Sequence, residues 1–305
     1  MSSLKPVQER LMALAPALDD NSRRLFHGRG GCYEGLNHVA IDWFSPALVI
    51  TLFEDLGASW EESLVSLVKQ EIPIAEAVYL QRRYKAKPSF ECVGGQPLVE
   101  LFARRQGLKF KLHLSQQNIG FFLDIEPARQ WLQTRCKAKR VLNLFAYTCS
   151  FSVLASHYGA SSVLNMDLSS KSLALGRESY RANAIPTDNV RFYANDILKS
   201  WGKLKRHGPY DLVIIDPPSF QKGSFVATKD YQKVLRRMAS LTTERADVLL
   251  GLNAPEISYS TFLDLARNAL DGFEFVERLT PSIDFPDADI EKALKLLVFR
   301  KSEAK

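Results

Sequence analysis

The sequence predicts an α/β protein in which a small α+β domain precedes a Rossmann-like domain built on a seven-stranded, mostly parallel sheet. Two observations on the pattern of apolar residues predict this fold class. From Arg140 onwards short apolar strands alternate strictly with helices, whereas the last two strand-like segments have no helix between them. Alternating strands and helices form a parallel sheet covered on both faces, and two strands joined without a crossover helix pair antiparallel. We therefore expect a parallel sheet closed by a C-terminal antiparallel hairpin.

The residues before this alternation are organised differently. Apolar residues at helical spacing predict a helix over residues 4–18, a basic, turn-rich link follows, and Ser59 begins a second helix that runs to about Gln70. We expect three parts: an N-terminal helix and linker (1–29), a small α+β domain (30–115) and the Rossmann-like domain (116–305). Strands of the small domain are expected over residues 39–44, 47–53, 77–81, 98–102 and 108–114, of which the first two form a hairpin.

The second part contains the elements of the parallel sheet. Its strands are expected over residues 141–145, 162–167, 190–194, 210–215 and 247–252, followed by the hairpin strands 272–280 and 293–300. The helices between them are expected over residues 150–158, 169–183, 230–241 and 259–270, and a further one begins at Asp196.

Composition excludes several classes of protein. The chain has 305 residues, 46% of them hydrophobic, so it can bury the cores of two domains. No stretch approaches the ~20 apolar residues of a membrane helix, and the N-terminal sequence lacks a secretion signal. The cysteines are far apart and none are paired at metal-ligand spacing: Cys32, Cys92, Cys136 and Cys149. We therefore expect a soluble, cytoplasmic protein with reduced thiols and no metal.

Ligands of open α/β sheets bind beyond the carboxyl ends of the strands. The first such end runs from Asn143 into a helix, and its small residues would let the backbone approach a ligand next to free helix N–H groups. The usual glycine-rich turn is missing, so this segment alone is equally typical of an ordinary strand–helix loop. The candidate cofactor-binding residues here are Asn143, Phe145, Ala146, Tyr147, Thr148, Cys149, Ser150 and Phe151.

Acidic residues end the next two strands. Asp167, with Leu168 and Ser169, lies 24 residues after Asn143, where a βαβ unit places a carboxylate that accepts hydrogen bonds from ribose hydroxyls. The alternative is that Asp167 only favours the dipole of the helix that follows. Further along, Asp196, flanked by Asn195 and Ile197, is placed to accept the amino group of adenine, and it can also cap a helix.

The fourth strand end is the most specific of these motifs. A buried strand leads directly into Asp216, Pro217, Pro218, Ser219 and Phe220. The two prolines fix φ and supply no N–H, which leaves carbonyl groups free to face a ligand. A rigid turn is the alternative interpretation, but an aspartate at the end of a fourth parallel strand favours a catalytic site made of these five residues.

With these motifs in place, the chain resembles the bacterial large-subunit ribosomal RNA methyltransferases, a group that includes 23S rRNA cytosine-C5 and guanine-N7 enzymes. The resemblance extends from Gly30 to Lys301. It is carried by residues 143–152, Asp167-Leu168-Ser169, Asp196, residues 216–225, Lys229-Asp230-Tyr231 and, in the front half, residues 35–53, 107–114 and 120–124. A parallel sheet with a C-terminal hairpin is also typical of S-adenosylmethionine (SAM) dependent methyltransferases, whereas nicotinamide dehydrogenases lack that hairpin.

The resemblance implies a SAM-dependent methyltransferase that acts on RNA. It adds Phe122 and Asp124 to the cofactor-binding residues, because in the family this segment reaches the cofactor site. It also implies possible RNA contacts by the small domain, and it allows a homodimer. Two departures from the family stand out. We expect the family's N-terminal PUA domain to be absent, because only a short helix precedes residue 30, and the family often has glycine where Cys149 and Ser150 stand.

The positions of the cysteines indicate which kind of atom accepts the methyl group. Cytosine C5 must first be attacked by a cysteine, which in these C5 enzymes follows strand five, and here residues 251–256 contain no cysteine. We therefore expect methylation of a base nitrogen, with Asp216 or the Pro217 carbonyl accepting a proton from an exocyclic amine. Phe220 is a candidate to stack on a flipped base.

The net charge of +6 suits a polyanionic partner such as RNA. Of the basic clusters, residues 82–87 are the best candidate for phosphate binding because they include an aromatic residue and lie in the small domain. The alternatives are a methyltransferase of a protein side chain or small molecule, and a non-catalytic RNA-binding assembly protein. A nicotinamide oxidoreductase is disfavoured because no GxGxxG motif is present.

Overall fold

A computed structural model describes residues 3–85, 90–221 and 225–302, which leaves Lys87 of the basic cluster and residues 222–224 of the family motif outside the described residues. The chain divides into two compact units, an N-terminal unit (Met1–Leu123 and Ile283–Ala288) and a C-terminal unit (Asp124–Ser282 and Asp289–Lys305). This division differs from the three parts that we expected. In the compact units the N-terminal helix lies with the small domain, the division falls after Leu123, and a short segment late in the chain joins the N-terminal unit.

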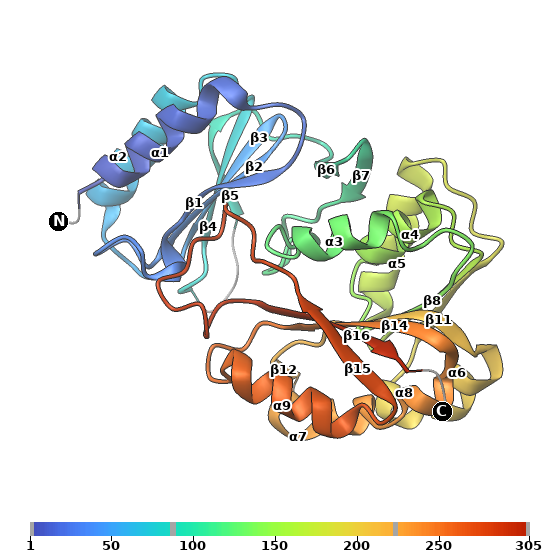
Figure 1. The fold of residues 1–305 in the computed structure, drawn as a ribbon. Helices are drawn as coiled ribbons and strands as arrows, with labels where there is room; N and C mark the ends of the chain where they lie inside the picture. Colours follow the sequence, from blue (N-terminus) through green and yellow to red (C-terminus); the bar gives the residue numbers. More distant parts are fainter. Residues whose placement is uncertain (1–2, 86–89, 222–224, 303–305) are drawn as a thin grey trace. The chain divides into compact units, whose positions relative to one another are not determined.

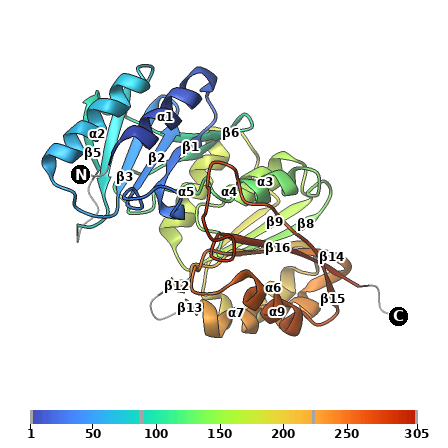
Figure 2. The same ribbon diagram turned by 60° about the vertical axis from the view of Figure 1, so that its left-hand side comes forward.

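The N-terminal unit is built on a five-stranded sheet with the order β1-β2-β3-β4-β5. Helices α1 (Lys5–Leu14) and α2 (Ala58–Glu71) lie side by side against this sheet (Figure 2). Val7 and Leu11 of α1 are fully buried in the same apolar core as Leu64 and Val68 of α2, which is why the N-terminal helix belongs to this unit. The strands are β1 (Arg23–His27), β2 (Val39–Phe44), β3 (Ala47–Leu52), β4 (Ala77–Arg82) and β5 (Phe90–Gly95), and β6 (Phe102–Arg105) and β7 (Leu108–Lys111) form a separate hairpin.

Two strands of this unit were not predicted. β1 lies in the segment that we expected to be a link, because only Leu25 and Phe26 in it are fully buried and the apolar signal is short. β5 has small and half-exposed residues typical of an edge strand. Conversely, the strand expected over residues 98–102 is absent before Phe102, where β6 begins.

The C-terminal unit has a seven-stranded sheet with the order β10-β9-β8-β11-β14-β16-β15. The first five strands in this order are parallel, and β16 inserts antiparallel between β14 and β15. This arrangement confirms the predicted fold class, including the C-terminal hairpin. The strands are β8 (Arg140–Leu144), β9 (Ser162–Asp167), β10 (Val190–Ala194), β11 (Tyr210–Ile215), β14 (Thr242–Leu252), β15 (Phe273–Arg278) and β16 (Lys295–Lys301).

Helices cover both faces of this sheet (Figure 1). One layer contains α3 (Glu126–Gln133), α4 (Ser150–His157) and α5 (Ser170–Ala182), and the other contains α6 (Trp201–His207), α7 (Ala227–Leu235), α8 (Met238–Leu241) and α9 (Tyr259–Ala269). Because the central strands are covered on both faces, their sequences are mostly apolar, as in residues 212–215 of β11. Helix α3 was not predicted, and a 3-10 turn (Ile197–Lys199) separates Asp196 from α6.

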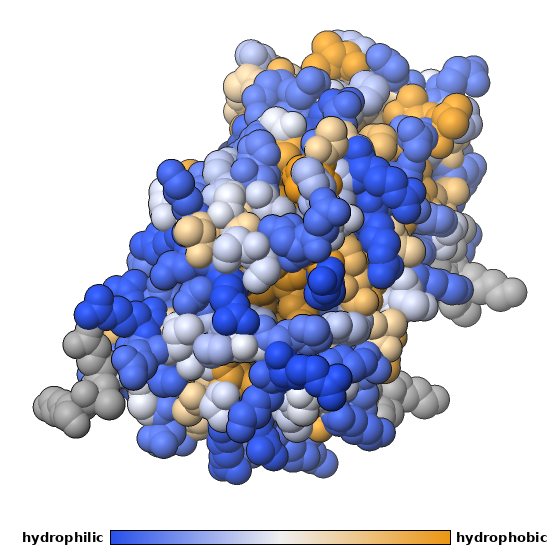
Figure 3. Space-filling view, turned by 90° about the vertical axis from the view of Figure 1, so that its right-hand side faces the viewer, coloured by the Kyte–Doolittle hydropathy of each residue, from blue (hydrophilic) through white to orange (hydrophobic). Residues whose placement is uncertain are grey.

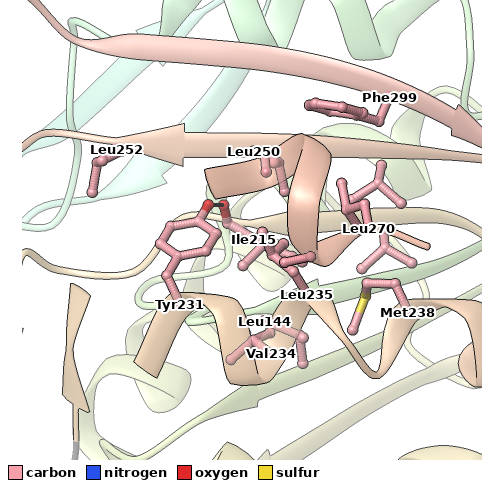
Figure 4. Packing of buried hydrophobic residues seen from close by; sticks show 14 of the residues in the cluster. Leu144, Ile215, Tyr231, Val234, Leu235, Met238, Leu250, Leu252, Leu270 and Phe299 are labelled. Atoms are coloured by element: carbon pink, nitrogen blue, oxygen red, sulfur yellow. Dashed lines mark hydrogen bonds between the residues drawn. The ribbon is translucent and has the colours of Figure 1, made fainter. Parts of the chain in front are cut away.

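The core between the sheet and the second helix layer includes a hydrogen-bonding tyrosine. Figure 4 shows Tyr231 of α7 among leucine side chains, with its hydroxyl beside the carbonyl of Ile215. The Tyr231 hydroxyl oxygen lies 2.9 Å from the Ile215 carbonyl oxygen and 3.0 Å from the Gly251 carbonyl oxygen. Burial raises the pKa of Tyr231, so its hydroxyl keeps its proton and donates. Tyr231 therefore joins the ends of β11 and β14.

The surface drawn in Figure 3 is mostly hydrophilic. Within the described ranges, no helix combines the length and the apolar character needed to cross a bilayer.

The buried hydroxyl of Tyr231 provides a test of this packing. We expect Tyr231→Phe to lower the free energy of unfolding by about 1–3 kcal/mol, because two buried carbonyl groups lose their donor. Tyr158→Phe is the matched control, since the Tyr158 hydroxyl accepts one bond from Gln133 at a half-buried position. Urea denaturation of both variants measures the difference. Equal stability of the two variants would show that the Tyr231 hydroxyl does not hold the strand ends together.

Candidate cofactor and active site

The carboxyl ends of five parallel strands meet at one edge of the C-terminal sheet. Register pairs Leu144 with Met166 and Ile215, Ala194 with Asp167, and Ile215 with Leu250. The sequence-predicted residues of the C-terminal unit therefore come together there, from four separate segments: 143–151, 167–169, 195–197 and 216–220. Parallel pairing places all four segments at the same edge.

The loop between β8 and α4 has a left-handed backbone at three residues that are not glycine. The φ angles of Phe145, Tyr147 and Cys149 are 57°, 46° and 60°. Such a conformation costs about 1–2 kcal/mol per residue for an L-amino acid with a Cβ atom. Hydrogen bonds offset this strain, because Ala146 N–H donates to the Met166 carbonyl at 3.2 Å and Cys149 N–H donates to the Ala146 carbonyl at 2.7 Å. The loop thus reaches a glycine-like conformation without glycine.

A glycine is instead present on the neighbouring helix. A Cβ atom at Gly176 of α5 would lie 2.7 Å from Sγ of Cys149 and 3.2 Å from the Thr148 carbonyl oxygen. Gly176 therefore allows α5 to pack directly against the loop. Cys149 is fully buried at this contact, and burial raises the pKa of its thiol.

The predicted residues of this segment differ in exposure. Asn143 is 1% exposed, and its amide donates to Ser152 Oγ at 2.8 Å within a buried network that includes Asn165. The side chains of Asn143 and Cys149 are buried and contact other protein groups, so only the backbone of these residues can face a ligand. Ala146, Thr148 and Phe151 are also buried, whereas Phe145, Tyr147 and Ser150 are half-buried.

Asp167 lies at the end of β9 with both carboxylate oxygens engaged. Oδ2 accepts the N–H of Tyr147 at 2.9 Å and Oδ1 accepts the N–H of Ser169 at 2.7 Å. Burial raises the pKa of Asp167, and these two N–H groups oppose the rise. Each carboxylate oxygen has a second lone pair, so Asp167 can accept two further hydrogen bonds from a ligand. Ser169 caps α5 by accepting the N–H of Ser172.

A cleft opens beside Asp167 at the ends of β8, β9 and β10. This small cleft is lined by Phe145, Leu168, Asn195, Asp196, Ile197, Leu198, Gln221 and Phe225. Leu168 is 45% exposed, so it offers an apolar surface to a ligand. Asp196 caps the 3-10 turn, because its carboxylate accepts a hydrogen bond from the N–H of Leu198 at 2.9 Å. The side-chain oxygen of Asn195 accepts a hydrogen bond from the ammonium group of Lys203 at 2.8 Å. A cleft lined by apolar side chains and by a carboxylate offers partners for the face and the amino group of a heterocycle.

Asp216 lies at the end of β11, close to Gly251 of β14. A Cβ atom built on Gly251 would lie 2.3 Å from Oδ1 of Asp216, so only glycine leaves room for this carboxylate. Burial raises the pKa of Asp216 to about 7, the negative charge of Asp124 adds to the rise, and Arg129 opposes it. Near neutral pH this carboxylate can therefore gain or lose a proton.

Asp124 and Phe122 were predicted from the same motif but belong to different units. Asp124 begins the C-terminal unit, and its Oδ2 accepts the side-chain N–H of Asn253 at 3.4 Å. Asn253 follows β14, so Asp124 lies at the strand ends with Asp216. Phe122 belongs to the N-terminal unit, where its side chain is 44% exposed.

The segment after Asp216 forms a short hairpin. Pro217 is buried and Pro218 exposed, and the Ser219 carbonyl accepts the N–H of Ala227 at 3.0 Å. Strand β12 (Phe220–Gln221) pairs with β13 (Phe225–Val226). Phe220 is 64% exposed, whereas Phe225 is buried with its ring 4.8 Å from that of Phe145. The hairpin therefore presents one aromatic ring to solvent and one to the cleft.

Several residues of this edge were not predicted as site residues. Gln221 and Phe225 lie in the family motif, but only the hairpin brings them to the cleft. Gly251 leaves room for the Asp216 carboxylate, and the charge of Arg129 lowers its pKa. Tyr231 donates to the carbonyl of Ile215, the residue before Asp216. A glycine that ends an apolar strand was the one sequence signal for a close approach at Gly251.

Comparison with known proteins gives concordant matches. A family model described as S-adenosylmethionine-dependent methyltransferase matches residues 23–300. The chain is 25% identical over 300 residues to a Bacillus subtilis (strain 168) protein named as ribosomal RNA large subunit methyltransferase YwbD, which covers 93% of this chain and 75% of that protein. It is 26% identical to ribosomal RNA large subunit methyltransferase I of Shewanella amazonensis, with coverage of 83% and 68%.

A solved structure shares the fold. The crystal structure of SMU.776, described as a methyltransferase complexed with SAH, superposes with a TM-score of 0.85 and 23% sequence identity. The match covers 96% of this chain and 81% of that chain.

The contact between Gly251 and Asp216 can be tested directly. We expect Gly251→Ala to lower the free energy of unfolding by about 1–3 kcal/mol, because the added methyl group overlaps the carboxylate. Gly202→Ala is the control, since a Cβ atom at Gly202 in α6 meets nothing within 4 Å and alanine favours a helix. Thermal unfolding of both variants gives the comparison. A Gly251→Ala protein as stable as wild type would contradict this close packing.

Proposed function

Because the chain belongs to the family of S-adenosylmethionine-dependent methyltransferases, we propose that it methylates a base nitrogen of large-subunit ribosomal RNA without a cysteine nucleophile. The protein is thus a SAM-dependent enzyme with a Rossmann-like fold. Our proposal concerns the acceptor atom, a base nitrogen, and the RNA that carries it. The observation that carries the nitrogen assignment is the Asp216 carboxylate, which ends β11 with a pKa raised to about 7.

The residues at the strand ends fit SAM. When bound, SAM supplies a methyl group activated by its sulfonium. In this proposal Asp167 accepts hydrogen bonds from the ribose hydroxyls with its remaining lone pairs. Phe145, Leu168 and Ile197, which line the cleft, would contact the adenine, and Asp196 of the same lining would accept a hydrogen bond from its amino group. The loop after β8 and the N-terminal turn of α4 would face the methionine portion.

The cysteines of the chain argue against attack by a thiolate. Cys136 and Cys149 are the cysteines of the C-terminal unit, and both are fully buried. Burial raises the pKa of Cys136 to about 12 and that of Cys149 still further. Neither thiol is ionised near neutral pH, and a thiolate is the form that attacks a cytosine ring. Cys32 and Cys92 belong to the N-terminal unit.

Asp216 is suited to the proton transfer that methylation of an exocyclic amine requires. The amine nitrogen forms a bond to the methyl carbon with its lone pair, the bond between that carbon and sulfur breaks, and sulfur keeps the electron pair. The nitrogen then carries a surplus proton, which the Asp216 carboxylate accepts. A base with a pKa near the working pH is the most effective for this task.

Two further observations support a nucleic-acid acceptor. Phe220 is 64% exposed and follows the Asp-Pro-Pro segment, so a base turned out of its stack would find an aromatic surface next to Asp216. The chain carries a net charge of +6, which favours a polyanion. The names of the Bacillus and Shewanella relatives motivate the choice of large-subunit ribosomal RNA.

Asp216→Asn tests the proposed base. We expect this variant to bind SAM but to transfer methyl groups about 10²–10⁴ times more slowly, because asparagine accepts no proton. In the wild type the rate should fall as pH drops below about 7, where Asp216 becomes protonated. The raised pKa also means that Asp216 destabilises the fold increasingly as pH rises from about 4 towards 7, so the variant should gain stability at neutral pH.

Transfer of labelled methyl groups to ribosomal RNA, followed by nucleoside analysis, measures these rates and identifies the product. Asp188→Asn is the control, because Asp188 is exposed in the same unit. A product methylated at cytosine C5 would overturn the nitrogen assignment. An unchanged rate in Asp216→Asn would overturn the base role and leave a ring nitrogen, which needs no base.

A further inference from the structure

One edge of the N-terminal sheet brings two arginines and an aromatic ring together. β1 is antiparallel to β2, β2 is antiparallel to β3, and β3 is parallel to β4, so β1, β3 and β4 run in the same direction. Residues that follow these strands therefore meet at one edge. They are Arg29, in the 3-10 turn Gly28–Gly30 after β1, Phe53 after β3 and Arg83 after β4.

Both arginines lie over the same ring. The guanidinium carbon of Arg29 is 4.1 Å from the centroid of the Phe53 ring, and that of Arg83 is 5.4 Å from it. Guanidinium groups are attracted to the face of an aromatic ring, which also fixes the plane of the charged group. We call Arg29, Phe53 and Arg83 the two-arginine cluster.

The backbone holds these three residues in place. Arg83 N–H donates to the Leu52 carbonyl at 2.8 Å, and Phe53 N–H donates to the His38 carbonyl at 2.9 Å. Arg29 is fixed by its two glycine neighbours, since a Cβ atom at Gly28 or Gly30 would lie 1.8 Å from a carbonyl oxygen. The two-arginine cluster is therefore set by close backbone packing and not only by flexible side chains.

The charges of the two arginines are not balanced by carboxylates. Within the described residues neither Arg29 nor Arg83 forms an ion pair, and Arg83 donates to the neutral Asn118 side chain at 3.3 Å. Burial lowers the pKa of both arginines, the positive charge of Arg24 lowers that of Arg29 further, and Arg29 does the same to Arg83. The cluster thus concentrates positive charge that an anion would neutralise.

The neighbouring basic residues, in contrast, are either paired with carboxylates or uncharged. Arg24 forms two hydrogen bonds with the Asp42 carboxylate, and Arg82 is paired with Glu61 and with Glu91. His27 is neutral at pH 7, because burial and the charges of Arg24 and Arg29 lower its pKa to about 3. In the expected phosphate-binding cluster over residues 82–87, Arg82 is already paired with carboxylates and residues 86 and 87 lie outside the described residues. Arg83 lies over the same ring as Arg29.

We propose that the two-arginine cluster is a docking site for a backbone phosphate of the RNA substrate. This inference rests on the proposed function and adds a site in the N-terminal unit, apart from the methyl-transfer residues of the C-terminal unit. Planar guanidinium groups bind phosphate oxygens with paired hydrogen bonds, and neutralising two adjacent cations relieves their repulsion. Phosphate contacts of this kind position a nucleic acid without reading its sequence.

The test measures binding of protein-free bacterial 23S ribosomal RNA to the full chain as a function of salt. We expect Arg29→Gln/Arg83→Gln to weaken binding by about 10–100-fold at low salt and to reduce the slope of log K against log salt by about 1–2. Lys5→Gln/Lys137→Gln removes the same charge at two exposed positions and should change both quantities far less. Inorganic phosphate at millimolar concentration should compete with the RNA in wild type.

Two further measurements separate the outcomes. SAM titration should give wild-type affinity for Arg29→Gln/Arg83→Gln, and its unfolding temperature should be equal or higher because like charges are removed. Arg29→Lys/Arg83→Lys keeps the charge without the planar fork, so it should retain the salt slope but lose affinity.

RNA binding by Arg29→Gln/Arg83→Gln that matches the Lys5→Gln/Lys137→Gln control would overturn the docking site and leave the proposed function intact. Competition by phosphate without any loss of RNA affinity in the variant would also overturn it. If wild type shows no salt-dependent RNA binding at all, both the RNA substrate and the docking site are contradicted.

Discussion

The parallel alignment of β8, β9, β10, β11 and β14 is the constraint on which the site depends, because it brings Asp167, Asp196 and Asp216 to one edge. At that edge the two carboxylates Asp167 and Asp216 have different electrostatic surroundings. Burial raises the pKa of both Asp167 and Asp216. Two N–H groups oppose the rise at Asp167, whereas the charge of Asp124 adds to it at Asp216. In the proposed function, Asp167 would accept hydrogen bonds from the cofactor and Asp216 would accept a proton.

The loop between β8 and α4 reaches a left-handed backbone conformation without glycine. Phe145, Tyr147 and Cys149 adopt left-handed backbone conformations that glycine would adopt without strain. Contacts with β9 and with α5 hold them there, through the Met166 carbonyl and the close approach of Gly176. The strain is therefore supported by packing around the loop, as is common at ligand sites.

Strand ends were predictable from the sequence because each is marked by an apolar run followed by a polar residue, as at Asp167 and Asp216. Side-chain surroundings were not, because they depend on packing between distant segments. The Asn143 side chain, for example, is buried in a hydrogen-bond network with Ser152 and Asn165. The carboxylate partners of Arg82 likewise arise from sheet topology, as does the position of Arg29 and Arg83 over one ring. A cluster of basic residues in the sequence does not reveal these contacts.

SAM binding at this edge should depend on Asp167 as a hydrogen-bond acceptor. Calorimetric titration of wild type, Asp167→Asn and the exposed control Asp188→Asn with SAM tests it most directly. We expect saturable binding by wild type and the control, and affinity about 10–100 times lower for Asp167→Asn, because charged hydrogen bonds are lost. Equal affinity in Asp167→Asn, or no binding of SAM by wild type, would contradict the account.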